Sequence, residues 1–439
     1  MEVTQKPHLH RDWIDPHAYG IVKALQKSGH QTYLVGGCVR DLLVGIHPKD
    51  FDIATMAHPP QVRRLIYMSY IIGKRFRLVL VKREDQQFEV ATFRREFNPD
   101  DFPEGAPPGD NVFGTPEEDA CRRDFTINAL FYDPINDQLI DFVNGLDDID
   151  HRTLRMIGEP DLRLAEDPIR ILRGLRLAHK LNFQIEGSLR DSMTRMSSEI
   201  LKSVLPRRRE EILKFLRLPD PARALLELFD LGILKYVIPT LHDLITHPER
   251  RELFLGLFDT YRNVVVDPTQ PVELFGWLVY SMLQTALQGP TDRETPLKIE
   301  DEVFQNLMRE ELGMYKFEQA ALIKAVELLP SIQRVNDFSR RGERRQLSLI
   351  KNEGFKLGLQ IAKSDFIVSP HGFQFWQDAV DRLAPDLGHS EGNSKSRRKR
   401  TRKRRGSSHR DVDAKTDPAK STSASADDHD SATSIPDGN

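Results

Sequence analysis

Residues 33–55 read YLVGGCVRDLLVGIHPKDFDIAT. An apolar run with high β-propensity, residues 33–35, is followed by Gly36 and Gly37, and the spacing of apolar residues predicts a short amphipathic helix over residues 39–44. Two glycines allow the backbone to approach a bound group closely, and a helix that follows them offers unpaired N–H groups to a phosphate. The order of strand, glycines and helix therefore predicts a phosphate-binding turn.

A second strand is predicted over residues 49–53, after a Gly-to-Pro turn. Asp50 and Asp52 are two residues apart, and on a strand such residues project from the same face. Two neighbouring carboxylates beside a phosphate site are the hard oxygen ligands that Mg²⁺ needs to handle a nucleoside triphosphate. An isolated Asp-x-Asp is usually a solvated turn, but its position after the glycines favours a metal site.

The ordered set GG-x-V-R-D followed by D-x-D resembles the nucleotide-binding motif of the class II nucleotidyltransferases. This superfamily holds the bacterial poly(A) polymerases and the CCA-adding tRNA nucleotidyltransferases. The resemblance implies an α+β fold with a polymerase-β-like head, a mixed sheet with helices, and a Mg²⁺ site at the catalytic residues Asp50 and Asp52. It also implies that the triphosphate is bound by Gly36, Gly37 and Arg40.

Composition limits the class of protein. The chain has 439 residues, with 63 basic and 66 acidic side chains and only two cysteines, Cys38 and Cys121. No disulfide framework is indicated, and we expect Cys38 to pack as a small buried residue. No apolar run is long enough to cross a membrane, and the first residues lack an apolar signal core. We therefore expect a soluble cytoplasmic protein with no membrane partner.

Four segments are expected along the chain. Residues 1–150 form the nucleotidyltransferase head, residues 151–218 a helical neck, and residues 219–388 an all-α body that binds RNA. Residues 389–439 are too poor in apolar side chains to fold and should be disordered. They open with the run KSRRKRTRKRR at residues 395–405 and continue into an acidic, Ser-rich end. The basic run is expected to contact RNA, although such a run can also be a solubilising tail.

Within the head, residues 15–29 predict a helix with an N-cap at Asp15 and a C-terminal cap at Gly29. Strands are predicted over residues 75–82 and 88–93. Glu89 faces opposite to Val90 and would join the two aspartates if the strands are neighbours. A third carboxylate there could draw a proton from an attacking hydroxyl. The alternative, a solvent-facing Glu on a half-buried strand, stays equally open.

The stretch CRRDFTINAL at residues 121–130 carries two arginines and an aspartate. Guanidinium groups match phosphate oxygens well, although Arg-Arg-Asp is more often a surface ion-pair cluster. RRDFTINAL resembles the second motif of the same family. That resemblance implies a catalytic role for Asp124 and triphosphate binding by Arg123.

Residues 163–177, RLAEDPIRILRGLRL, predict an amphipathic helix with Pro168 in its first turn. Asp167 and Arg170 are three residues apart and can meet on one helical face, with Arg173 further along. The stretch resembles the family motif EDPxRxLR, which implies that Asp167, Arg170 and Arg173 bind the nucleotide and that the first two read the base without a template. Leu164 and Ala165 depart from the aromatic and basic residues usual there.

Two further stretches were considered. Residues 98–114 are rich in Pro, Gly and Asp and predict a long flexible loop that could order over a substrate. His242-Asp243 is a dipeptide also found in metal-dependent phosphohydrolases, but no further ligands lie in register, so a turn residue is predicted.

The stretch IIGKRFRL at residues 71–78 resembles the poly(A) polymerase branch of the family. The predicted function is therefore ATP-dependent, template-independent adenylation of RNA 3′ ends in mRNA processing and decay. The alternatives are a CCA-adding tRNA nucleotidyltransferase and a non-catalytic RNA-binding protein.

Overall fold

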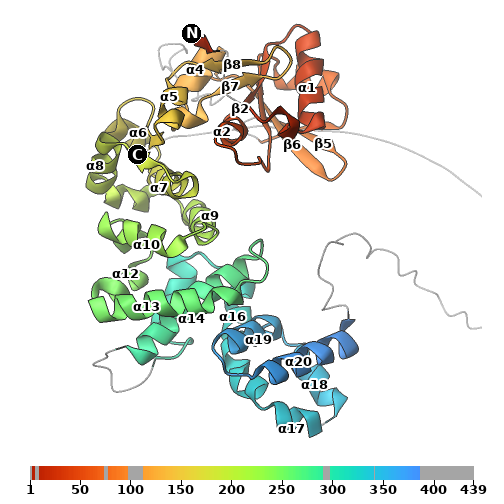
Figure 1. Ribbon diagram of the computed structural model, residues 1–439, viewed down its shortest axis with the longest axis vertical. Helices are drawn as coiled ribbons and strands as arrows, with labels where there is room; N and C mark the ends of the chain where they lie inside the picture. The colour runs from red at the N-terminus through yellow and green to blue at the C-terminus, as the bar shows by residue number, and fades with distance from the viewer. Residues whose placement is uncertain are drawn as a thin grey trace, which may run out of the picture. The chain divides into compact units, whose positions relative to one another are not determined.

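The computed structural model describes residues 2–4, 9–73, 78–96, 112–289, 297–340 and 342–385. Its N-terminal part is built on one mixed β-sheet, and the part that follows is almost entirely helical (Figure 1). The predicted flexible loop lies largely outside the described residues, and the predicted basic tail and the whole stretch KRFR at residues 74–77 lie outside them.

The head contains an eight-stranded sheet in the order β1-β8-β7-β2-β3-β6-β5-β4. The strand pair β3 and β6 is parallel and every other neighbouring pair is antiparallel, so the sheet is mixed, as the fold prediction required. The strands are β1 Glu2–Thr4, β2 Thr32–Val35, β3 Asp52–Thr55, β4 Ser69–Ile72, β5 Leu78–Arg83, β6 Gln86–Thr92, β7 Phe131–Asp133 and β8 Gln138–Asp141.

One face of this sheet is covered by helices. The helices α1 (Pro16–Lys27) and α3 (Pro59–Leu65) bury residues such as Ile21 and Val62 against Ile53, Val79 and Val90 of the strands. Burial of this apolar area is the main stabilising contribution to the head. The alternation along each strand leaves Asp52 and its cross-strand neighbours on the opposite face.

The opposite face is covered over only part of its width. Around strands β2 and β7 a small core, which includes Val35, Phe93 and Phe131, packs against Ala120 of α4 (Pro116–Cys121). Further along the sheet, Glu89 of β6 and Tyr70 of β4 are exposed. The sheet therefore offers an accessible surface on the side of strands β6, β5 and β4.

The first helix confirms its sequence signals. The Asp15 carboxylate accepts hydrogen bonds from the backbone N–H groups of His17 and Ala18 at 2.7 and 3.2 Å, with Pro16 at the first helical position. Gly29 ends the helix with a φ of +84°. A carboxylate at the N-cap satisfies N–H groups that otherwise lack partners.

The described residues that follow the head are mostly helical and share one large apolar core. They include α5 Gly145–Asp150, α6 Pro160–Glu166, α7 Ile169–Leu181, α8 Gly187–Arg195, α9 Leu205–Leu216, α10 Pro221–Asp230, α12 Pro239–Thr246, α13 Pro248–Thr260, α14 Pro271–Gln288, α16 Lys316–Gln333, α18 Glu343–Ile350, α19 Phe355–Ser364 and α20 Pro370–Leu383. Two short strands, β9 Thr153–Leu154 and β10 Gln184–Ile185, pair in parallel beside α7. None of the helices in the described ranges is long and apolar enough to span a membrane.

The prediction for His242 is wrong in one respect. His242 lies inside α12 rather than in a turn, where its ring packs against Phe229 and its Nδ1 lies 3.1 Å from the Asp243 carboxylate. Within the described ranges, no group of three or more His, Cys, Asp or Glu side chains is arranged to hold a metal ion.

Candidate active site

The turn after β2 has the geometry that the two glycines predict. Gly36 has a φ of +73°, a left-handed conformation that favours glycine, and α2 (Gly37–Leu43) begins directly after it. A Cβ atom at Gly36 would lie 3.1 Å from the Arg123 guanidinium, and one at Gly37 would lie 3.5 Å from that of Arg40. The glycines therefore bring two arginines close to an open backbone turn, which is a suitable arrangement for a phosphate group.

Asp50 and Asp52 are not both on a strand. β3 begins at Asp52, which pairs with Val35, the last residue of β2. The antiparallel ladder stops there because the chain turns away at Gly36, so the predicted strand over residues 49–53 is wrong at its start. Asp50 lies in the preceding connection, near enough to Asp52 for their charges to interact.

Glu89 is brought beside Asp52. The two residues are direct partners in the parallel ladder between β3 and β6, and both are exposed on the same face of the sheet. The strands are therefore neighbours, which was the condition for Glu89 to join the aspartates. The carboxylates of Asp50, Asp52 and Glu89 make one acidic region at the edge of the diglycine turn.

The electrostatics of Asp52 reflect this crowding. The surrounding protein removes water from the carboxylate, which raises the pKa of Asp52, and the negative charges of Glu89 and Asp50 raise it further. Arg123 acts in the opposite direction but does not cancel these effects. Uncompensated negative charge on hard oxygen ligands suits a divalent cation, so Asp50 and Asp52 fit the predicted Mg²⁺ site.

The two arginines of the RRD motif share one acceptor. Asp119 of α4 accepts hydrogen bonds from Arg123 at 2.9 and 3.2 Å and from Arg122 at 2.6 and 3.0 Å. Burial alone would raise the pKa of Asp119, but the charges and hydrogen bonds of the arginines outweigh it and hold the pKa below its usual value. A buried carboxylate thus aims Arg123 toward the glycine turn, where it also donates to the Asn128 carbonyl at 3.2 Å. The i,i+4 spacing of Asp119 and Arg123 in the sequence is a signal that could have predicted this ion pair.

Asp124 is held inside a hydrogen-bonded chain of side chains. Its carboxylate accepts from Asn128 at 3.0 Å and from Arg173 at 2.8 Å, and Asn128 in turn accepts from Arg40. Burial opposes ionisation, yet Arg173, Asn128 and the following backbone N–H together lower the pKa of Asp124. These contacts hold Asp124 in position and link Arg40 to α7, and the catalytic role that the resemblance implies for Asp124 stays a prediction.

The predicted pairing of Asp167 with Arg170 is wrong. Asp167 lies between α6 and α7 and forms a bidentate ion pair with Arg207 of α9, with N–O distances of 2.8 and 2.9 Å. Arg170 donates to Glu166 at 3.0 Å and to the Arg163 carbonyl at 2.7 Å. A partner that is 40 residues away overrides the local i,i+3 rule, and Arg207 is a residue that sequence reasoning missed.

α6 and α7 are tied to the RRD motif. Arg163 is almost fully buried and donates to the backbone carbonyls of Arg122 and Arg123 at 2.7 and 2.9 Å. On α7, Arg173 bonds Asp124 and Lys180 bonds Asp41 at 2.9 Å. The helix that carries Arg170 therefore lies directly beside the arginines of the head.

The structure explains why Leu164 can replace the aromatic residue that is usual at this position of the family motif. Leu164 is fully buried in the core and Ala165 is exposed. Neither residue offers an aromatic surface to a base at this site. Any recognition of a base here would depend on the polar side chains of Asp167 and Arg170.

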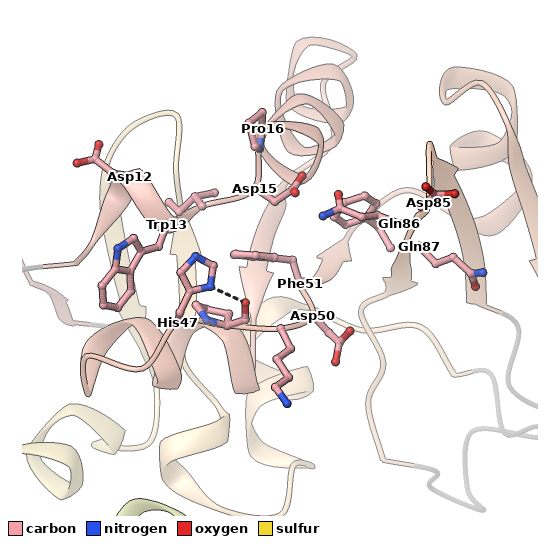
Figure 2. Close-up of a pocket in the computed structure, with 14 residues that line it drawn as sticks. Asp12, Trp13, Asp15, Pro16, His47, Asp50, Phe51, Asp85, Gln86 and Gln87 are labelled. Carbon is pink, nitrogen blue, oxygen red and sulfur yellow. Dashed lines mark hydrogen bonds between the residues drawn. The ribbon is translucent and has the colours of Figure 1, made fainter. Parts of the chain in front are cut away.

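A pocket of about 570 Å³ lies next to Asp50 (Figure 2). It is lined by Trp13, His47, Phe51 and Phe88 as well as Asp50, and the Asp50 carboxylate points away from the Trp13 side of this pocket. Asp52 and Glu89 do not line it. Of the three carboxylates of the acidic region, only that of Asp50 therefore borders this pocket.

Comparison with known proteins agrees with this geometry. Residues 32–155 match the family described as the poly A polymerase head domain, and residues 182–245 match one described as the probable RNA and SrmB-binding site of polymerase A. Residues 32–155 are therefore similar to a poly(A) polymerase head domain. This confirms the resemblance of the diglycine, Asp-x-Asp and RRD motifs to the class II nucleotidyltransferases.

Curated relatives belong to both branches of that family. The chain is 38% identical over 241 residues to poly(A) polymerase I of Haemophilus influenzae, covering 53% of each chain. It is 41% identical over 218 residues to poly(A) polymerase I of Escherichia coli O157:H7, covering 48% and 47%. It is 38% identical over 186 residues to the CCA-adding enzyme of Enterococcus faecalis, covering 42% and 44%. The chain thus spans about half the length of the curated relatives it matches.

Solved structures share the fold over most of the chain. The Bacillus stearothermophilus CCA-adding enzyme in complex with CTP has a TM-score of 0.56 at 22% identity, covering 85% of this chain and 83% of that one. The Thermotoga maritima CCA-adding enzyme complexed with tRNA has a TM-score of 0.58 at 20% identity, covering 87% of each. The head and the helices that follow it therefore have the architecture of this group.

Proposed function

We propose that this chain is a template-independent RNA nucleotidyltransferase that adds AMP from ATP to RNA 3′ ends. The observation that carries the proposal is the position of Asp52 and Glu89 beside the Gly36 turn, with the Arg123 guanidinium next to the turn and its positive charge acting on Asp52. A carboxylate pair next to a phosphate-binding turn is what transfer of a nucleotide to a hydroxyl requires.

The reaction forms one bond and breaks one. The RNA 3′-oxygen bonds to the α-phosphorus of ATP, the bond to the β-phosphate oxygen breaks, and pyrophosphate leaves. Mg²⁺ held by Asp50 and Asp52 would, when bound, supply positive charge at the attacking and leaving oxygens. Glu89 lies on the same face as Asp52 and is placed to accept the proton of the hydroxyl.

The remaining site residues bind ATP. The backbone of Gly36 and Gly37 and the guanidinium groups of Arg40 and Arg123 would hold the triphosphate. These arginines are already held by buried acceptors, so they lose little freedom when ATP binds. Asp167, Arg170 and Arg173 would bind the rest of the nucleotide.

Selection of adenine by Asp167 and Arg170 is part of the proposal. Both side chains are held by other residues, Asp167 by Arg207 and Arg170 by Glu166. A base site with fixed donors and acceptors discriminates between bases because the wrong base leaves buried polar groups unpaired. Support for adenine also comes from the poly(A) polymerase relatives, which are 38–41% identical over the matched region.

We also infer that the protein acts on mRNA 3′ ends in the cytoplasm. Both cysteines are free, Cys38 buried and Cys121 exposed, which suits a reducing compartment. Burial raises the pKa of Cys38 to about 12, so its thiol stays protonated and packs as a small apolar group. The basic tail would bind RNA by charge.

The second candidate is a CCA-adding enzyme, which is favoured by the CCA-adding relatives and by the shared fold. One experiment separates the two. Purified protein is given a generic RNA or a tRNA that lacks its CCA end, with each nucleoside triphosphate separately and with CTP and ATP together, in the presence of Mg²⁺ or of EDTA. Long A-only tails that EDTA abolishes support the proposal. A CCA product limited to tRNA, or no incorporation at all, contradicts it.

A further inference from the structure

A single row of side chains crosses the accessible half of the head sheet. Asp52 of β3 pairs with Glu89 of β6, Glu89 pairs with Leu80 of β5, and Leu80 pairs with Tyr70 of β4. Residues that are partners across neighbouring strands project from the same face. Asp52, Glu89, Leu80 and Tyr70, here called the open row, therefore lead from the acidic region to the edge of the sheet.

The open row ends in an aromatic and cationic pair. Tyr70 is 50% exposed, and the ammonium group of Lys82 lies 5.8 Å from the centre of its ring. Ile72 of the same strand is 39% exposed, so the surface around Tyr70 is partly apolar. An exposed ring beside a cation is the combination that single-stranded nucleic acid uses, with the base stacked and a phosphate neutralised.

We propose that the open row is the path of the RNA 3′ segment, with Tyr70 stacking on a base upstream of the reacting end and Lys82 contacting a phosphate. This inference rests on the function proposed above, because it needs the reacting hydroxyl at Asp52. It adds a binding surface for RNA on the head, separate from the helical body and the basic tail.

The distance along the row determines which nucleotide is held. Neighbouring strands are about 4.8 Å apart, so the three steps from Asp52 to Tyr70 span about 14 Å. With a rise of about 3.4 Å per stacked nucleotide, this distance corresponds to roughly four nucleotides. Tyr70 therefore cannot touch the reacting nucleotide and would hold only a primer long enough to reach the sheet edge.

This length requirement gives a sharp test. In Tyr70→Ala, the KM for a long oligoadenylate should rise about five-fold or more, as expected for the loss of one base stack. The KM for a dinucleotide primer, the KM for ATP and kcat should stay unchanged, and Tyr70→Phe should restore the long-primer KM. In Lys82→Gln, the slope of log affinity against log salt for the long primer should fall by about 0.7.

A matched control lies on the covered face of the sheet. Tyr19 of α1 also has a lysine over its ring, with Lys23 at 5.7 Å, but α1 packs on the side opposite to the open row. Tyr19→Ala and Lys23→Gln should leave every RNA parameter unchanged. An equal loss in the Tyr19 and Tyr70 variants would overturn the proposal, as would equal losses for short and long primers.

Binding measurements keep this inference separate from the proposed reaction. Fluorescence anisotropy with a labelled oligoadenylate reports RNA contact even if the wild-type protein transfers no nucleotide. A wild-type protein that is inactive on every RNA refutes the proposed function. An active wild-type protein whose Tyr70→Ala variant has unchanged affinity for long RNA refutes the open row alone.

Discussion

Asp52 and Glu89 face each other as partners on the parallel strands β3 and β6, one at the start of its strand and the other in the middle of its strand. Their pairing joins two segments that are nearly 40 residues apart in the sequence. It places a second exposed carboxylate at the only parallel ladder among the described strands of the head sheet.

Asp52→Asn should lose nucleotidyl transfer while the protein remains folded. Removing a ligand charge from the acidic region should lower kcat/KM by at least about 10²-fold. Because burial and the charges of Glu89 and Asp50 raise the pKa of Asp52, its negative charge opposes folding, and the neutral asparagine should not lower the free energy of unfolding. Single-turnover ATP incorporation and urea denaturation measure the two effects. A variant with a near-normal rate would show that Asp52 holds no metal.

Glu89→Gln distinguishes the two interpretations of this residue. If Glu89 accepts the proton of the RNA hydroxyl, the chemical step should slow by about 10²-fold or more. The glutamine keeps the shape of the side chain and its place on β6, so ATP affinity should not change. Rapid-quench kinetics at saturating ATP give the rate. An unchanged rate would assign Glu89 to the solvent-facing alternative.

Asp124→Asn should destabilise the protein by roughly 1.5–3 kcal/mol, because the buried Asp124 carboxylate loses its charge-assisted hydrogen bond to the partly exposed Arg173. Asp161 provides a matched control, since it also pairs with an arginine, Arg195, but both partners are exposed. Asp161→Asn should leave stability almost unchanged, because ion pairs between exposed side chains contribute little. Equal effects of the two substitutions in denaturant titrations would contradict the positioning function of Asp124.

Arg207→Ala should weaken nucleotide selection. Without the bidentate pair, Asp167 is free to rotate, and the preference for ATP over CTP in kcat/KM should fall about ten-fold. Arg208→Ala is the control, because the neighbouring arginine donates to the Tyr236 carbonyl and not to Asp167. Unchanged selectivity in Arg207→Ala would remove Asp167 from base recognition.

The pH dependence of stability should report on Glu227. Hydrogen bonds from His179 and Arg190 lower the pKa of Glu227 to about 2 from an ordinary value of 4.5. A carboxylate with a lowered pKa in the folded state stabilises the protein above its unfolded pKa, and the contribution is lost as the pH falls toward the folded value. The stability difference between wild type and Glu227→Gln should therefore shrink from pH 4.5 toward pH 2. A constant difference would contradict the ion pairs.

Local signals predicted the head well. The cap at Asp15, the turn at Gly36 and the strands around Glu89 all depend on neighbouring residues, and the sequence shows these directly. The start of β3 was predicted too early in the chain, because the alternation of polar and apolar residues in Asp50-Phe51-Asp52 resembles that of a strand. Only the ladder with β2, which ends at Val35, determines where pairing stops.

The contacts of the residues proposed to read the base were less predictable. Helical spacing favoured a pair between Asp167 and Arg170, but the break between α6 and α7 separates them, and Arg207 comes from another helix. Contacts between distant segments leave no periodic signal. The same limit applies to Arg163, whose partners are carbonyl groups of a different motif.

Two ion pairs fix the position of α7 relative to the head. Arg173 binds Asp124 and Lys180 binds Asp41, two turns apart on one helix, and both acceptors belong to the segments that hold the turn arginines. A helix fixed at two points can neither slide nor rotate without breaking an ion pair. The span from the arginines at Gly36 to Arg170 is therefore a set length, and in the proposed site it would have to match the distance between the phosphates and the base of the bound nucleotide.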